Sequence, residues 1–335
     1  MVITYYAAME RKTIDKVDLP LELAEVLEEC PGYTFFNTLE ELIEASVPIP
    51  EEDWFDVKFS VEGKGEVIEA QSCRVRNGIA VNYLEPYMRR RDPDCMLIGD
   101  ELPSDKPRYT ERFGDPFESM REETFRWLKS QELGCYTFAV GHEIVGVDAC
   151  VIAPKNVGFF AYGLALLQGI KDVRTAEKNI SPSCFLYVAP PFRHTHFDGK
   201  QVVVHNRSEE LYEIFSYNLY PGPSAKKGIY GALIHYGETE GWVTAHTSAV
   251  QVVTPYDNKV TIMHEGASGG GKSEMLEHVH REESGELLLG ENINTGEKHY
   301  ICLPRTCALH AISDDMALCH PSIQRDDGKL YILDA

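Results

Sequence analysis

Apolar and polar residues repeat at helical spacing near the start of the chain. The segments LPLELAEVLEEC (19–30) and NTLEELIEASVP (37–48) each carry an apolar stripe beside an acidic one, which predicts two amphipathic helices. Asn37 lies three residues before Glu40 and is the expected cap of the second helix. From residue 57 to residue 100 the pattern changes to short β-rich runs separated by glycines, which predict strands of a mixed sheet.

Helical and strand-like patterns then alternate along the chain. We expect helices over 115–133, within the uncharged run 156–170, and over 208–217. Between and after them lie strand-like runs, and these are 135–141, 145–153, 184–190, 200–206, 242–253 and 259–266. Strands that alternate with helices indicate a mixed α/β fold.

Composition and charge narrow the class of protein. The 335 residues are 43% hydrophobic, which is enough for two domains with substantial cores. The net charge of −21 argues against a nucleic acid or an anionic membrane as partner. The longest uncharged run is shorter than the roughly 20 residues that a membrane-spanning helix needs. Nine cysteines without a CxxC pair, and a start without a signal-peptide pattern, predict a cytoplasmic protein.

Residues 266–273 form a candidate phosphate loop. They read GASGGGKS, which fits GxxxxGK[ST], and they lie between a strand-like run and the segment SEMLEHVHRE (273–282), which predicts a helix. Glycines let successive backbone N–H groups face a phosphate, the lysine reaches the β- and γ-phosphates, and the serine hydroxyl can bind Mg²⁺. The predicted nucleotide-binding residues are Gly266, Ser268, Gly269, Gly270, Gly271, Lys272 and Ser273.

A phosphate loop also needs a carboxylate that holds the metal ion. The candidates are Asp314 and Asp315, which follow the strand-like run CALHAIS. An Asp-Asp pair considered alone is more typical of a surface turn. Its assignment therefore depends on the other motifs of the chain.

Four motifs occur in the order found in the phosphoenolpyruvate carboxykinases. Lys226-Lys227-Gly228 comes first, His246 follows in TAHTSAV, the phosphate loop is third, and the Asp-Asp pair is last. The chain from about residue 80 onward resembles this family, and RRDPDCMLIGD is similar to the family's GRSPxDK segment. The resemblance implies an N-terminal α/β substrate-side domain over 1–218 and a partial phosphate-loop domain over 219–335. It also implies that the chain is the N-terminal part of a longer protein.

The resemblance implies a role for each matching residue. Lys227, His246, Asp315 and Ser273 would hold Mn²⁺ and Mg²⁺, since nitrogen and oxygen donors of this mixture suit Mn²⁺. Arg91, Tyr220 and Lys226 would bind a small anionic substrate, and Lys227, Asp314 and Arg91 would be catalytic. The implied reaction converts oxaloacetate and ATP or GTP into phosphoenolpyruvate, the nucleoside diphosphate and CO₂.

Two other functions stay open at this point. The loop ends in GKSE, which is closer to the loop of HPr kinase/phosphorylase, and a kinase of that type would use Asp314 or Asp315 as a base. A nucleotide-binding module without turnover is the other alternative. The pattern does not choose between ATP and GTP or predict an oligomeric state.

Further histidines and cysteines have simpler interpretations. The HxH pairs at 194–196 and 278–280 are expected to be surface or loop histidines. The Cys/His-rich segment from Cys302 to His320 fits no zinc pattern, so we expect its cysteines to be core residues on strands.

Overall fold

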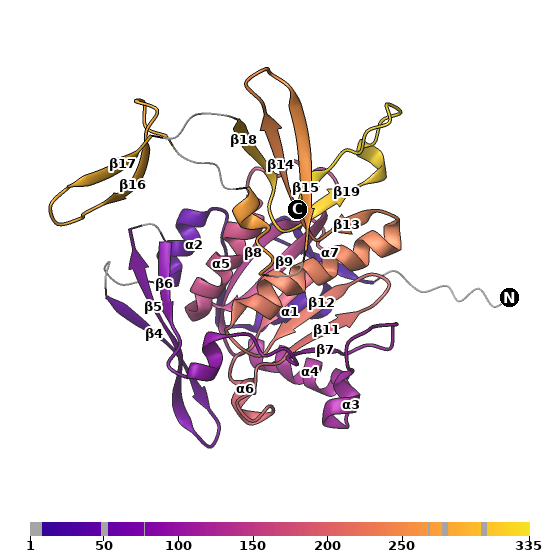
Figure 1. The fold of residues 1–335 in the computed structure, drawn as a ribbon. Helices are drawn as coiled ribbons and strands as arrows, with labels where there is room; N and C mark the ends of the chain where they lie inside the picture. Colours follow the sequence, from indigo (N-terminus) through magenta and orange to yellow (C-terminus); the bar gives the residue numbers. More distant parts are fainter. Residues whose placement is uncertain (1–8, 48–52, 77, 267–268, 277–280, 303–306) are drawn as a thin grey trace. The chain divides into compact units, whose positions relative to one another are not determined.

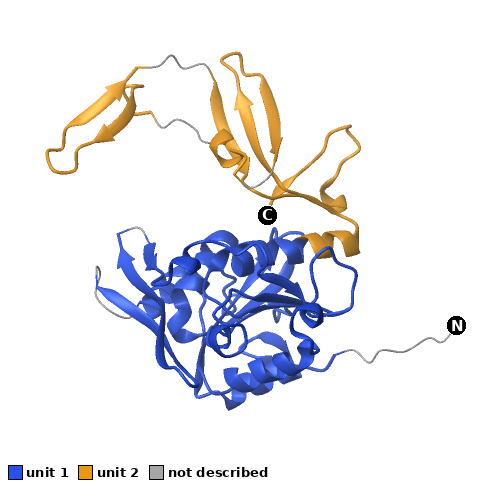
Figure 2. Cartoon of the chain, turned by 60° about the horizontal axis from the view of Figure 1, so that its bottom comes forward, with its two compact units in different colours: residues 1–233 blue, residues 234–335 orange. Residues whose placement is uncertain are grey.

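The computed structural model describes residues 9–47, 53–76, 78–266, 269–276, 281–302 and 307–335, and it shows a mixed α/β protein (Figure 1). Contacts within the chain divide it into two compact units, Met1–Leu233 and Ile234–Ala335 (Figure 2). The predicted boundary lay between residues 218 and 219. The observed division falls later, inside helix α7 (Lys227–Glu240).

A seven-stranded mixed sheet forms the centre of unit 1. Its order is β3 (Gly32–Phe35), β8 (Glu132–Val140), β9 (Val147–Pro154), β10 (Cys184–Val188), β12 (Tyr212–Ser216), β11 (Val203–Arg207) and β7 (Met96–Ile98). The pairs β8–β9 and β11–β12 are antiparallel, and the other neighbours are parallel. The central strands β10 and β12 are buried along their whole length, which explains their continuous apolar runs.

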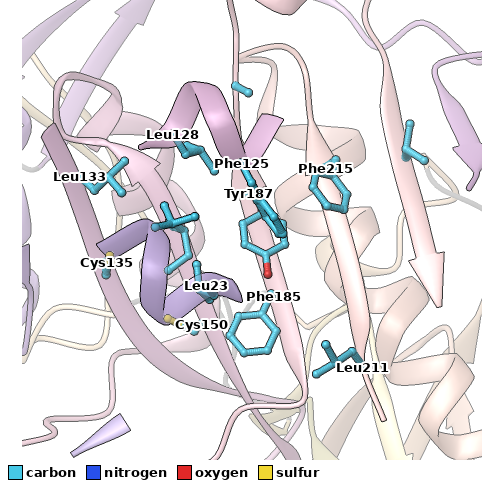
Figure 3. Close-up of a cluster of buried hydrophobic side chains, with 14 of the residues drawn as sticks. Leu23, Phe125, Leu128, Leu133, Cys135, Cys150, Phe185, Tyr187, Leu211 and Phe215 are labelled. Carbon is cyan, nitrogen blue, oxygen red and sulfur yellow. The ribbon is translucent and has the colours of Figure 1, made fainter. Parts of the chain in front are cut away.

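Helices cover both faces of this sheet. Helices α1 (Leu21–Glu29) and α4 (Phe117–Leu128) pack on the face that carries Phe185, Tyr187 and Phe215, and Figure 3 shows the resulting cluster of buried side chains. Helix α5 (Gly158–Gln168) lies against β8 and β9, and its Ala161 carbonyl accepts a hydrogen bond from the Tyr136 hydroxyl at 3.1 Å. Tyr136 is the neighbour of Cys135, whose side chain joins the first cluster, so the two residues point to opposite faces.

Smaller elements complete unit 1. Strands β1 (Arg11–Ile14) and β2 (Val17–Pro20) form a hairpin, and β4 (Trp54–Val61), β5 (Gly65–Val75) and β6 (Gly78–Asn82) form an antiparallel sheet of their own. The short helical elements are α2 (Leu39–Ser46), η1 (Pro86–Arg89), α3 (Tyr109–Phe113), η2 (Lys155–Val157), α6 (Phe192–Thr195) and the π-helical turn η3 (Gly222–Lys226).

Unit 2 consists mainly of antiparallel strands. One sheet has the order β15 (Lys259–Glu265), β14 (Thr247–Val253), β18 (Ala308–Ser313), and a second has the order β13 (Val243–Ala245), β19 (Ala317–Cys319), β20 (Leu333–Asp334). A hairpin of β16 (Leu287–Glu291) and β17 (Lys298–Ile301) and the single turns η4 (Ser273–Met275) and η5 (Pro321–Ile323) are the other elements.

Most of the predicted elements of unit 1 are confirmed, with three corrections. The strands predicted over 57–100 do not form one mixed sheet, because β4, β5 and β6 form a separate antiparallel sheet and only β7 joins the seven-stranded mixed sheet. The helix predicted over 208–217 is wrong, because this segment forms strand β12. The cap of α2 is Thr38 rather than Asn37: its hydroxyl accepts the Glu41 N–H at 3.1 Å, and the Glu41 carboxylate accepts the Asn37 N–H at 2.8 Å. No helix in the part of the chain that the structure describes is long and apolar enough to cross a membrane.

Candidate functional site

The three-stranded sheet β15–β14–β18 brings three distant segments to one end. Thr247 at the start of β14 pairs with Glu265 at the end of β15, and Ala249 pairs with Ser313 at the end of β18. Because both neighbours are antiparallel to β14, the residue before β14 and the residues after β15 and β18 meet at the same edge. These are His246, Gly266 of the phosphate loop, and the Asp314-Asp315 turn.

Lys272, His246 and Asp315 meet at this edge of the sheet. The His246 Nε2 atom lies 2.9 Å from Asp315 Oδ1, and the Lys272 ammonium lies 3.2 Å from His246 Nε2 and 3.8 Å from Asp315 Oδ1. The side chains of Lys272 and Asp315 are only 7% and 14% exposed, so their opposite charges interact with little screening by water. The structure thus joins three of the residues predicted from separate motifs.

The glycines of the loop allow backbone conformations that other residues avoid. Gly269 and Gly271 both have φ of 83°, in the left-handed region. The Lys272 ammonium also donates a hydrogen bond of 2.9 Å to the Gly266 carbonyl, which ties the two ends of the loop together. Gly270 lies between these described glycines, whereas the predicted residue Ser268 lies outside the described residues.

The helix expected directly after the loop is not observed in the described part of that segment. Ser273–Met275 form a single 3-10 turn, and residues 281 and 282 are not helical. Residues 277–280 lie outside the described residues, and so does the HxH pair at 278–280. Glu274 and Met275 are exposed, and Leu276 is buried.

Ser273 and Asp314 form a second contact beside the first. The Ser273 hydroxyl donates a hydrogen bond of 2.9 Å to Asp314 Oδ1, and both residues are exposed. A hydroxyl and a carboxylate are hard oxygen donors of the kind that Mg²⁺ prefers. Asp315, the next residue, has a φ of 84°, a left-handed conformation in which the two neighbouring carboxylates contact different partners.

Two buried hydroxyl groups donate hydrogen bonds to the backbone of the phosphate loop and of the strand before it. The motif analysis did not single these residues out. Ser248 is fully buried, and its hydroxyl donates a hydrogen bond of 2.9 Å to the carbonyl of Lys272. The Thr247 hydroxyl, which is also buried, donates to the His264 carbonyl at 2.9 Å. The available signal was the pair of hydroxyl residues that follows His246 at the start of a mostly apolar strand.

The other predicted site residues belong to unit 1. Lys226 ends the π-helical turn η3 and Lys227 begins α7, and their ammonium groups lie 6.0 and 5.8 Å from the centre of the Tyr230 ring. Such π-helical turns occur often at functional sites. The ring of Tyr220 lies 6.2 Å from that of Tyr83. A site shared by these residues and those of unit 2 stays a prediction.

Arg91 is the remaining predicted substrate residue, and it lies after η1 in unit 1. Its side chain is exposed, and within the described ranges of the chain its guanidinium makes no hydrogen bond or ion pair. A free guanidinium is available to a carboxylate from solution. Its assignment to a substrate carboxylate stays a prediction.

The expectations about histidines and cysteines are wrong in part. The His194 side chain is only 5% exposed and bonds through Nε2 to Glu69 of β5, and the neighbouring Arg193 contacts the same carboxylate at 3.1 Å. His196 is exposed, as expected. Cys302 and Cys307 are exposed rather than core residues, whereas Cys319 lies half-buried on β19. Among the residues that the structure describes, no three His, Cys, Asp or Glu side chains form a group that could hold a metal ion. The His246–Asp315 pair supplies only two such donors.

The chain matches a known protein family. A family model described as a domain of unknown function (DUF4914) matches residues 19–335, which cover all of unit 2 and most of unit 1. The curated proteins contain no match.

Proposed function

We propose that this chain, which belongs to the DUF4914 family, is a nucleotide- and divalent-metal-dependent phosphoryl-transfer enzyme of the phosphoenolpyruvate carboxykinase type. One observation carries the proposal. Lys272 of the phosphate loop, His246 and Asp315 come from three separate motifs and lie within 2.9–3.8 Å of one another. A chance match to a glycine-rich motif gives no reason for the other two residues to lie there.

The loop would bind the phosphates of ATP or GTP. Gly269 and Gly271 have the left-handed φ values that let backbone N–H groups turn toward an anion. The ammonium of Lys272 would leave its hydrogen bond to the Gly266 carbonyl and bind the β- and γ-phosphates. Local positive charge is required here, because the chain as a whole carries a net charge of −21.

The donor types beside the loop are ones that divalent metal ions bind. His246 and Asp315 offer an imidazole nitrogen and a carboxylate oxygen, donors that suit Mn²⁺, and in the proposal Lys227 adds its amine. Ser273 and Asp314 offer the hard oxygens that suit Mg²⁺. When bound, these ions would neutralise charge on the phosphates and on the substrate oxygen.

The Lys272 ammonium lies beside the two proposed donors of the Mn²⁺ site. It interacts with both His246 and Asp315, so a divalent cation would compete with it electrostatically. A nucleotide that draws this ammonium toward its phosphates would remove the competition. Nucleotide and Mn²⁺ are therefore expected to strengthen each other's binding, and by linkage both effects must be equal.

The substrate would be a small dicarboxylate with a 2-oxo group. Arg91 and Lys226 carry the positive charges for its carboxylates, and Tyr220 would orient it. The carbon–carbon bond to the departing carboxylate breaks and CO₂ leaves, and the electron pair remains as an enolate. The enolate oxygen then attacks the γ-phosphoryl group and the nucleoside diphosphate leaves, while Lys272 balances the negative charge on the transferred group.

The test incubates the purified chain with oxaloacetate, ATP or GTP, Mg²⁺ and Mn²⁺, and follows phosphoenolpyruvate by ³¹P NMR. We expect product with the unaltered chain and none with Lys272→Ala. Lys259→Ala removes an exposed lysine from β15 of the same sheet and should leave the product yield unchanged. Nucleotide binding without any turnover would favour the binding module, and phosphorylation of a hydroxyl acceptor without CO₂ release would favour the HPr-kinase type.

A further inference from the structure

Unit 1 contains a cleft that has no part in the phosphate-loop site. Its volume is about 380 Å³, within the range of about 300–1,000 Å³ that is typical of small-molecule sites. Its walls come from the end of β4, the second half of α4, and α6 with the residue after it. All of its lining residues are among those that the structure describes.

The floor of the cleft is apolar and aromatic. Val61 and Phe192 are 2% and 5% exposed, and the ring of Trp127 lies 5.7 Å from that of Phe192 in an edge-to-face arrangement. Such a floor favours a flat or aliphatic group of a ligand, since its burial removes apolar surface from water.

The rim of the cleft carries two opposite charges that are not used inside the protein. Glu123 is already paired with His196, whose Nε2 lies 3.5 Å from the carboxylate. The guanidinium of Arg126 and the carboxylate of Glu62 make no hydrogen bond or ion pair with any other residue in the described ranges. A ligand would therefore meet one available cation and one available anion above an apolar floor.

These charges select one class of ligand. A simple anion would pair with Arg126 but would be repelled by the carboxylates of Glu62 and Glu123. A simple cation would pair with Glu62 but would be repelled by the guanidinium of Arg126. A zwitterion satisfies both available charges. We propose that this cleft binds a free α-amino acid with an apolar side chain, which would place its carboxylate at Arg126, its ammonium at Glu62 and its side chain against Trp127 and Phe192.

Isothermal titration calorimetry on the full chain tests the proposal with L-phenylalanine as the probe. Phenethylamine lacks the carboxylate and 3-phenylpropionate lacks the ammonium. We expect L-phenylalanine to bind about tenfold more tightly than either analogue, as is typical for one charge-assisted hydrogen bond at a partly exposed site.

Single variants assign each charge. Arg126→Gln should abolish the preference for L-phenylalanine over phenethylamine, and Glu62→Gln should abolish the preference over 3-phenylpropionate. Glu122→Gln changes an exposed carboxylate of α4 that does not line the cleft, and it should alter neither preference.

Three results would overturn the proposal. One is the absence of L-phenylalanine binding up to about 10 mM in folded protein. Another is an analogue that binds as tightly as the amino acid, which would indicate a simple anion or cation site instead. The third is an unchanged preference in both Arg126→Gln and Glu62→Gln, which would place any binding outside this cleft.

Discussion

The hydrogen bond from Ser248 to the phosphate loop allows a sharp test of how the loop is held. Ser248 is fully buried on β14, and its hydroxyl donates to the Lys272 carbonyl at 2.9 Å. Ser248→Ala removes the donor and leaves this carbonyl without that partner. Lys272 is only 8% exposed, so water has little access to replace the lost hydrogen bond.

The Lys272 carbonyl also accepts the Met275 N–H at 3.2 Å, so Ser248→Ala removes one of its two hydrogen bonds. The loss of one hydrogen bond costs about 0.5–1.5 kcal/mol. Phosphate binding requires one loop conformation, whereas the free loop can relax, so most of this cost should reduce nucleotide affinity. The dissociation constant of ATP or GTP should rise by roughly 2- to 10-fold, measured by isothermal titration calorimetry in the presence of Mg²⁺.

Ser216→Ala is the matched control for Ser248→Ala. Ser216 is also fully buried on a strand, and its hydroxyl donates to the Asn218 carbonyl at 2.8 Å, but it lies in unit 1. Ser216→Ala should lower the free energy of unfolding by about the cost of one lost hydrogen bond, and it should leave nucleotide affinity unchanged. The reasoning is refuted if Ser248→Ala binds nucleotide as tightly as the unaltered chain, or if Ser216→Ala weakens binding equally.

Three further predictions concern stability and reactivity. Glu213 accepts two hydrogen bonds of 2.9 Å from Arg121, so Glu213→Gln should lower the free energy of unfolding by about 3 kcal/mol in urea titrations, and a change below about 0.5 kcal/mol would contradict this. Burial lowers the pKa of His205 to about 4, below its unfolded value of 6.5, so stability should fall as the pH drops from 6.5 to 4 by up to about 1.4 kcal/mol per pH unit. In His205→Gln this part of the pH dependence should disappear. An unchanged slope of the free energy of unfolding against pH between 4 and 6.5 would refute the assignment to His205. Iodoacetamide should label Cys302 and Cys307 in the native chain and the buried cysteines only after unfolding, as read by mass spectrometry.

The convergence at the phosphate loop could be predicted because each motif lies at the end of a strand. His246 precedes β14, the loop follows β15, and Asp314 follows β18. The order of motifs in the sequence suggested that these residues share a site. The antiparallel pairing that brings them to one edge is a long-range property, and only the structure shows it.

The errors arise where tertiary contacts outweigh local pattern. The acidic residues at 209 and 210 resemble the start of a helix, yet the segment after them becomes a strand enclosed between β10 and β11. Glu213 lies inside this strand because Arg121 on α4 neutralises it. The His194 side chain can likewise be buried because it pairs with Glu69, a carboxylate that is distant in sequence. The local sequence pattern does not predict ion-pair partners that are distant in sequence.

The most direct test of the proposed function locates the metal and the nucleotide together. Crystals of the chain grown with Mn²⁺ and a non-hydrolysable ATP analogue would be measured by anomalous diffraction. The proposal predicts phosphates at the loop, with the Lys272 ammonium turned toward them. It also predicts a manganese peak that contacts His246 Nε2, Asp315 and the Lys227 amine. Phosphates at the loop without manganese beside His246 and Asp315, or Lys227 outside the coordination sphere, would contradict the carboxykinase-type mechanism.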